Sequence, residues 1–145
     1  GGRDSTCRRR RAFAPTSRVG GMGYRTVATG DVEPAEDRPC ELRQLTAAAA
    51  LENVAINRYS VDPGEEIPLA YHYHDEQEET FYVISGAIEV ETPEGTSAVG
   101  ADELFAADPE SPHRAYCPDD ADGAAEVLAV GAPPTEGDAH AYDPE

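Results

Sequence analysis

The chain has 145 residues, which is enough for one compact domain with a hydrophobic core and too few for two. It contains 29 acidic residues against 11 arginines and no lysine, and 39% of its residues are hydrophobic. The formal net charge of −18 disfavours nucleic-acid and anionic-membrane partners, and no apolar run approaches the roughly 18–20 residues of a transmembrane helix.

The first region, residues 1–21, differs in charge from the rest of the chain. It holds six arginines against one aspartate, a local charge of +5, whereas residues 22–145 hold five arginines against 28 acids, a charge of −23. Met22 is the only methionine and stands at this boundary, so we interpret residues 1–21 as a non-native or disordered extension. A twin-arginine export signal is disfavoured because no apolar segment follows, and an RNA-binding arm is disfavoured because the remaining acids repel phosphate.

Residues 22–53 are expected to form a flexible N-terminal arm with a short helix. Prolines and charges interrupt any periodicity over residues 24–44, where at most one short strand is expected. The stretch TAAAALEN at 46–53 is typical of a helix, because alanine favours helix and Thr46 is a preferred N-cap residue.

Residues 54–131 change to short alternating segments separated by turns, such as the tripeptides at 62–64 and 93–95. We expect strands at 54–61, 69–74, 80–85, 87–92, 97–100, 103–107, 113–117 and 125–131. Short strands at this spacing predict an all-β antiparallel sandwich or barrel. Residues 132–145 are expected to form a loose acidic tail, in which His140 is solvated.

The acids are spread along residues 22–145 and are not confined to one tail. A charge of −23 would destabilise the fold by self-repulsion, whereas molar salt shortens the Debye length to ~3 Å and screens it. We therefore expect a halophilic protein from a salt-rich cytoplasm. The cysteines at 7, 40 and 117 share no CxxC spacing and indicate neither disulfides nor a zinc cage, which agrees with a cytoplasmic location.

The segment YHYHDEQEETFYVISG, residues 71–86, carries the main functional signal. His72 and His74 lie two apart in a predicted strand and therefore share one face, with Tyr71 and Tyr73 on the other. Two neighbouring imidazoles inside a barrel each need a partner, which a metal ion would supply. Glu78 and Glu79 follow at the next strand, and His113 begins a later one. The alternative is that the histidines are ordinary hydrogen-bonded core residues.

The pattern H-x-H-x4-E-x6-G, formed by His72, His74, Glu79 and Gly86, resembles the first motif of the cupin superfamily, and DPESPHR at 108–114 resembles the second. The resemblance covers residues 54–131 and implies a small double-stranded β-helix (jelly-roll) barrel. It also implies a divalent iron, manganese, nickel or zinc ion held by His72, His74, Glu79 and His113. Glu79 is preferred to Glu78 because six residues separate it from Gly86 and because it shares parity with the apolar Phe81.

Several positions depart from the family pattern. Asp102, Asp108 and Glu110 stand where the second motif has glycine, proline and glycine, and Cys117 replaces an asparagine. Gly64 lies seven residues before the first histidine, where the family has a glycine five residues before it. Cys117 is interpreted either as a small core residue or as a sulfur ligand near the site.

Two functions follow as expectations. In the first, the protein is an enzyme whose metal ion binds a small organic acid or sugar derivative, as an oxygenase or isomerase does. In the second, it is a non-catalytic module that binds or senses a small-molecule ligand. The resemblance and the need to cover exposed strand edges both favour a homodimer.

Overall fold

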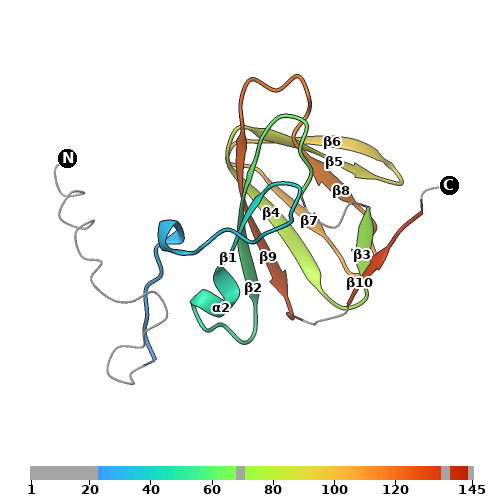
Figure 1. The fold of residues 1–145 in the computed structure, drawn as a ribbon. Coiled ribbons are helices and arrows are strands. Elements are labelled where there is room, and N and C mark those ends of the chain that lie inside the picture. Colours follow the sequence, from blue (N-terminus) through green and yellow to red (C-terminus); the bar gives the residue numbers. More distant parts are fainter. Residues whose placement is uncertain (1–22, 68–70, 135–137, 144–145) are drawn as a thin grey trace.

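The computed structural model describes residues 23–67, 71–134 and 138–143, which form an almost all-β chain (Figure 1). The strands are β1 (Glu41–Gln44), β2 (Ala55–Val61), β3 (His72–His74), β4 (Glu78–Ser85), β5 (Ala87–Thr92), β6 (Gly95–Gly100), β7 (Leu104–Ala107), β8 (Arg114–Tyr116), β9 (Ala125–Ala132) and β10 (Ala139–Ala141). The helical elements are the 3-10 turn η1 (Thr29–Asp31) and the helix α2 (Leu45–Ala48). Every strand expected between residues 54 and 131 is present, although positions 69 and 70 of one of them lie outside the described residues.

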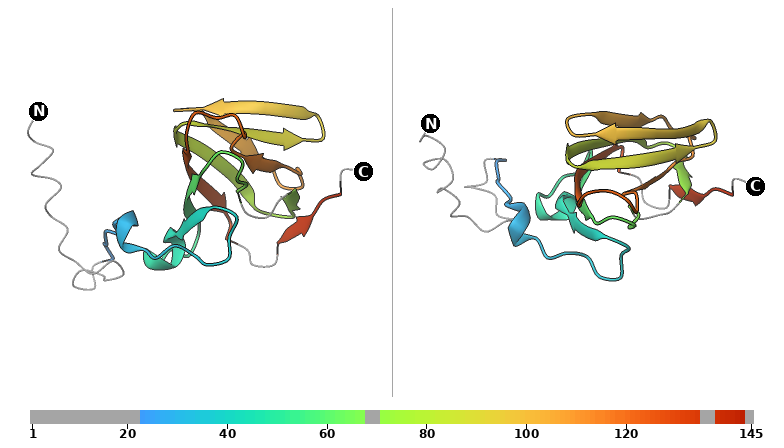
Figure 2. Two further views of the ribbon diagram at one scale, coloured as in Figure 1. Left: turned by 45° about the horizontal axis from the view of Figure 1, so that its top comes forward. Right: turned by 90° about the horizontal axis from the view of Figure 1, so that it is seen from above.

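The strands form three antiparallel sheets. Five strands follow the order β1-β2-β9-β4-β7, three follow β6-β5-β8, and β10 pairs with β3. Figure 2 shows the three-stranded sheet stacked over the five-stranded one, with the β3–β10 pair at one end. This arrangement confirms the predicted double-stranded β-helix architecture.

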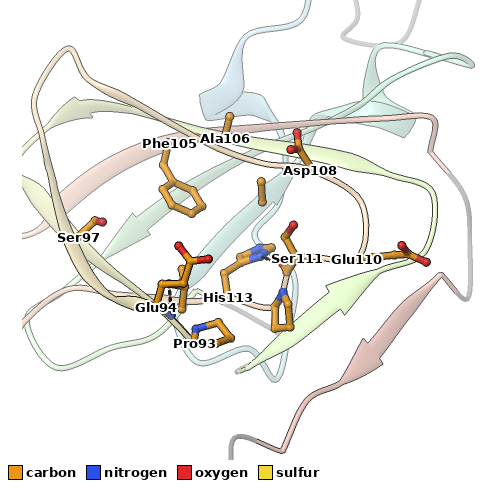
Figure 3. A pocket seen from close by; sticks show the side chains of 12 residues that line it. Pro93, Glu94, Ser97, Phe105, Ala106, Asp108, Glu110, Ser111 and His113 are labelled. Atoms are coloured by element: carbon orange, nitrogen blue, oxygen red, sulfur yellow. Dashed lines mark hydrogen bonds between the residues drawn. The ribbon is translucent and has the colours of Figure 1, made fainter.

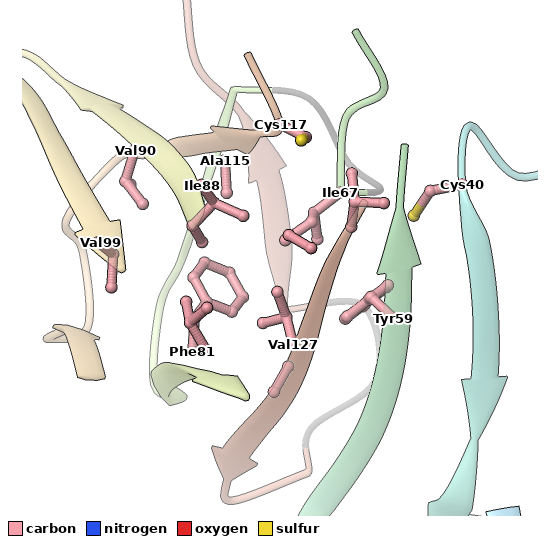
Figure 4. Packing of buried hydrophobic residues seen from close by; sticks show 14 of the residues in the cluster. Cys40, Tyr59, Ile67, Phe81, Ile88, Val90, Val99, Ala115, Cys117 and Val127 are labelled. Carbon is pink, nitrogen blue, oxygen red and sulfur yellow. The ribbon is translucent and has the colours of Figure 1, made fainter. Parts of the chain in front are cut away.

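The hydrophobic core fills the space between the two larger sheets (Figure 4). Strand β9 alternates buried and partly exposed residues, so that Val127 and Ala129 point inward. Phe81 from β4 and Ile88 and Val90 from β5 meet them and are at most 1% exposed. Burial of such side chains contributes about 1.5–3 kcal/mol each, which makes this cluster the main source of stability.

Gly86 joins β4 to β5 in a conformation that other residues avoid. Its φ is +78°, and a Cβ atom there would lie 2.7 Å from the carbonyl oxygen of Ala124. The chain can therefore turn from one sheet to the other at this point only if no side chain is present. The last position of the first motif must therefore be glycine for steric reasons.

The helix is shorter than its sequence suggests. It was expected over 46–53 but spans Leu45–Ala48, because Ala50 has a φ of +55° and ends it. Thr46 is not the N-cap, and its hydroxyl instead accepts the backbone N–H of Ile56 at 2.9 Å. The guanidinium of Arg25 donates to the carbonyl oxygens of Ala49 and Ala50 at the end of the helix.

The expectation of a loose tail is wrong for residues 138–143. Strand β10 pairs in register with β3, so that Ala139 faces His74 and Ala141 faces His72. His140 is not simply solvated, because its Nε2 lies 2.7 Å from Asp75 Oδ2 and its ring stacks on Tyr73. A strand of three residues, two of them alanine, is too short to be recognised from alternation in the sequence.

The predicted extension at residues 1–21 lies outside the described residues. Within the described part of the chain, no helix is long and apolar enough to cross a membrane.

Candidate metal centre

Three segments bring the candidate ligands together at one end of the barrel. Strand β3 carries His72 and His74 on its inner face, and β4 presents Glu79 from the neighbouring sheet. His113 stands immediately before β8. Tyr71 lies on the opposite side of the β3 segment against Tyr142, as strand parity predicts.

The three imidazoles converge on one carboxylate oxygen. The distances to Glu79 Oε1 are 2.9 Å from His113 Nε2, 3.4 Å from His74 Nε2 and 3.5 Å from His72 Nε2. The ligand atoms of His72, Glu79 and His113 all lie within 4.8 Å of one another. His74 is outside that tightest group, but its distance to Glu79 places it at the same centre. Glu78, the alternative acid, is exposed.

The histidines are deeply buried. His113 is 2% and His72 6% exposed, and the side chain of His74 is 10% exposed. Neither ring nitrogen of His74 has a hydrogen-bond partner among the described residues. A buried polar nitrogen without a partner costs about 1–3 kcal/mol, whereas the neutral nitrogen is a good ligand for a divalent transition metal. The donor set therefore fits a metal ion better than it fits a dry core.

Hydrogen bonding at His113 orients its ring. The Nδ1 atom lies 2.9 Å from the backbone carbonyl oxygen of Ser111, which can only accept, so Nδ1 carries the proton. Nε2 then faces Glu79 Oε1 at 2.9 Å, where a bound metal ion would replace the hydrogen of this contact, the arrangement that metal-binding histidines usually show.

Glu79 is held as a carboxylate. Burial raises its pKa, but the hydrogen bond from His113 first, and then the nearby imidazoles of His72 and His74, lower it more strongly. The net result is a pKa well below the ordinary value for a glutamate. The centre thus offers three nitrogen donors and one negatively charged oxygen.

Backbone hydrogen bonds fix the loop before β8 against β3. His72 and His113 exchange a pair of N–H to O=C bonds of 3.1 and 2.9 Å, and the N–H of Glu110 donates to the carbonyl of His74 at 2.6 Å. Both Asp102 and Glu110, which stand where the family has glycine, have a φ of +67°. Both positions therefore adopt the left-handed conformation that glycine favours, although neither is a glycine.

A cavity of about 480 Å³ adjoins the centre. Figure 3 shows Phe105 and His113 pointing into it, and Glu94 projecting from the β5–β6 turn. Its lining residues are Thr92, Pro93, Glu94, Ser97, Phe105, Ala106, Ala107, Asp108, Glu110, Ser111, Pro112 and His113. These include three carboxylates and three hydroxyl groups but no lysine or arginine, so the cavity offers acceptors and small donors.

Cys117 and Arg114 lie apart from the centre. Cys117 is fully buried in the hydrophobic cluster, which supports its interpretation as a core residue. Arg114 forms hydrogen bonds with Glu66 at 2.7 Å and with Glu91 at 3.0 Å.

Asp138 and Phe105 are residues near the site that the sequence did not indicate. Asp138 is 8% exposed, and its carboxylate lies 3.7 Å from Nδ1 of His74. Nothing distinguishes it in the sequence from the many other acids of the chain. Phe105 lies in a segment whose alternation is typical of any strand, and the centroids of its ring and the His113 ring are 6.0 Å apart.

Several solved structures share this fold. The polyketide cyclase RemF from Streptomyces resistomycificus is 20% identical, with a TM-score of 0.67 over 83% of this chain and 86% of its own. A sugar phosphate isomerase of the cupin superfamily from Silicibacter pomeroyi is 23% identical, with a TM-score of 0.63 over 72% and 66%. Streptomyces Pac13 with bound uridine is 17% identical, with a TM-score of 0.63 over 80% and 88%.

A search of curated proteins found no match. The family model described as "Cupin domain" matches residues 57–131, which is more than half of the chain and includes all of the candidate ligands. The motif residues, the jelly-roll topology and this match lead to one conclusion: the chain belongs to the cupin family.

Proposed function

We propose that the protein is a metal-dependent cupin that binds one divalent ion through His72, His74, Glu79 and His113. The observation that carries this proposal is the convergence of three Nε2 atoms to within 3.5 Å of Glu79 Oε1. A cluster of this kind is stable without metal only at a cost in buried polar groups, and neither ring nitrogen of His74 has a hydrogen bond among the described residues to offset that cost.

The donor set suits iron, manganese, nickel or zinc, and it leaves a divalent ion with a net charge near +1. Such an ion supplies Lewis-acid polarisation of a bound oxygen or, if redox-active, activation of dioxygen. The protein's own part is to hold the donors in a buried cluster and to shape the adjoining cavity.

The cavity favours a neutral, hydroxyl-bearing substrate such as a sugar derivative or nucleoside. Glu94, Asp108 and Glu110 would repel a phosphate or carboxylate group that is not bound to the metal, and no arginine or lysine among the described lining residues would offset this repulsion. Carboxylates and the hydroxyls of Ser97 and Ser111 can instead bind substrate hydroxyl groups. Of the two expected classes, small organic acids and sugar derivatives, the second fits better. Uridine, the ligand of Pac13, is of this neutral kind.

The same carboxylates are the groups that can move a proton. Glu94 projects into the cavity from the β5–β6 turn, and the backbone of Glu110 is fixed by its bond to the His74 carbonyl. An isomerase needs a base near the carbon that loses its proton, and carboxylates in a partly enclosed cavity can serve. We therefore favour isomerase-type chemistry over a role in oxygenation.

A binding or sensing module is the second candidate. The observation that favours it is that the described residues that line the cavity include no histidine other than His113 and no lysine. If the carboxylates only bind substrate hydroxyls, the metal would capture a ligand without converting it.

The test begins with metal analysis of the protein purified in molar salt without an affinity tag. We expect about one equivalent of a divalent metal, followed by tighter calorimetric binding of uridine or a neutral sugar than of the corresponding phosphate. Turnover of a bound neutral ligand would select the enzyme, and binding without turnover would select the module. A protein that refuses added metal, or that prefers the phosphates, would overturn the proposal.

A further inference from the structure

One buried carboxylate has no part in the proposed function. Asp138 is 8% exposed and lies at the start of the C-terminal strand, seven residues beyond the segment that matches the cupin family. Buried aspartates are rare unless their oxygens are satisfied by hydrogen bonds or by opposite charge.

The first set of contacts of Asp138 is with the turn after β3. Its carboxylate accepts the backbone N–H groups of Asp75, Glu76 and Gln77 at 3.0 to 3.2 Å. This turn connects the strand that carries His72 and His74 with the strand that carries Glu79. Asp138 therefore fixes the relative position of the two strands that supply most of the candidate ligands.

The second contact is with a candidate ligand itself. Asp138 Oδ2 lies 3.7 Å from Nδ1 of His74, while Nε2 of the same ring lies 3.4 Å from Glu79 Oε1. The imidazole thus lies between two carboxylates, one at the centre and one behind it. A carboxylate behind a metal-binding histidine usually accepts its second N–H and fixes the tautomer that directs the other nitrogen to the metal.

Strand β10 holds Asp138 in this place. Its residues pair with β3, with Ala139 opposite His74 and the backbone N–H of Tyr142 bound to the carbonyl of Tyr71 at 3.0 Å. On the outer face Tyr142 packs on Tyr71, with ring centroids 4.9 Å apart. Figure 1 shows β10 beside β3 at the edge of the barrel, away from the five-stranded sheet.

We propose that Asp138 is a positioning residue for His74, and that the C-terminal strand β10 thereby completes the metal centre. The inference rests on the proposed metal centre. Asp138 does not bind the metal. Its carboxylate holds the turn at 75–77 and lies behind His74, where it can accept the Nδ1–H when Nε2 binds the metal.

The test compares Asp138→Asn with a matched control, Asp75→Asn, in the full-length protein. Asparagine keeps one oxygen that can accept the backbone N–H groups of the turn but offers His74 no charged acceptor. The control removes the exposed contact between Asp75 and His140, which also joins β3 to β10, and leaves His74 untouched. Both variants therefore alter the contact between the two strands, and only the first alters the environment of His74.

Two readouts are needed. Zn²⁺ affinity is measured by competition with a chelator, and the His74 Nδ1–H proton is followed in the Zn²⁺-loaded protein by ¹H–¹⁵N NMR. We expect about 10- to 100-fold weaker Zn²⁺ binding for Asp138→Asn and less than about 3-fold for Asp75→Asn. The His74 Nδ1–H signal should move and exchange faster with solvent in Asp138→Asn, and it should be unchanged in the control.

The outcomes separate the two proposals. If the wild type binds no Zn²⁺, the metal centre is refuted and the role of Asp138 in it falls as well. If the wild type binds Zn²⁺ and both variants bind it equally, with the same Nδ1–H signal, Asp138 only caps the turn and the inference alone is wrong. A lowered melting temperature with unchanged affinity and an unchanged Nδ1–H signal would contradict it in the same way.

Discussion

The two ends of the barrel interior are built from the same strands and have opposite chemistry. Along β4 the inward residues change from Glu79 to Phe81 and then to Val83, so that a carboxylate gives way to buried apolar side chains within five residues. The segment from 113 to 117 makes the same change, from His113 to Ala115 and Cys117, all buried.

The difference separates stability from function. The apolar end contributes the burial that folds the chain, and nothing at that end is available for chemistry. The polar end gathers three imidazoles around one carboxylate, a buried polar cluster that weakens the fold unless a ligand satisfies it. Variants at the two ends should therefore fail in different ways.

The largest effect is expected at the apolar end. Phe81→Ala should lower the free energy of unfolding by about 3–5 kcal/mol, because it leaves a cavity in a site that is 1% exposed. Urea denaturation followed by circular dichroism measures this loss. Ile84→Ala, on the same strand at 41% exposure, should change stability by less than about 1 kcal/mol. Equal losses in the two variants would contradict the assignment of the core.

A smaller effect is expected where β4 turns into β5. Gly86→Ala should cost about 2 kcal/mol or more, because the new Cβ meets the Ala124 carbonyl oxygen at 2.7 Å in addition to the strain of a φ of +78°. Gly64→Ala is the matched control, since its φ of +88° imposes similar strain but its Cβ meets only the carboxylate of Asp119, a side chain that can move. Thermal unfolding should show a clearly larger decrease for Gly86→Ala; a larger decrease for Gly64→Ala would refute the steric argument.

The smallest effect is expected at the polar end and has the opposite sign. Glu110→Gly should raise the free energy of unfolding by up to about 1 kcal/mol, because glycine adopts a φ of +67° without steric strain. The backbone bond from residue 110 to the His74 carbonyl would be kept. A destabilisation of more than about 1 kcal/mol in urea denaturation would mean that the glutamate side chain supports the loop.

Much of this molecule could be predicted from its sequence. The alternation in 54–131 and the turn residues between its segments reflect local physics, and the barrel strands lie where they were expected. The spacing of His72, His74 and Glu79 is also local, because strand parity and one turn determine it. These features required no knowledge of contacts between distant parts of the chain.

The remaining features depend on distant contacts. Strand β10 forms because β3 offers an edge, and its own three residues carry no pattern. Asp138 is distinguished from other acids only by being buried against the turn at 75–77. The helix ends early because Ala50 has a positive φ, which alanine seldom adopts. The residues around Ala50 do not predict this conformation.

The candidate centre is best tested by comparing the metal content and metal-free stability of His74→Ala with those of Glu78→Ala. His74→Ala should lose the bound metal, and its metal-free form should stay within about 1 kcal/mol of the metal-free wild type, because buried nitrogens without a hydrogen bond are removed. Glu78→Ala should keep about one equivalent. Equal metal content in the wild type and both variants would contradict the assignment of the centre.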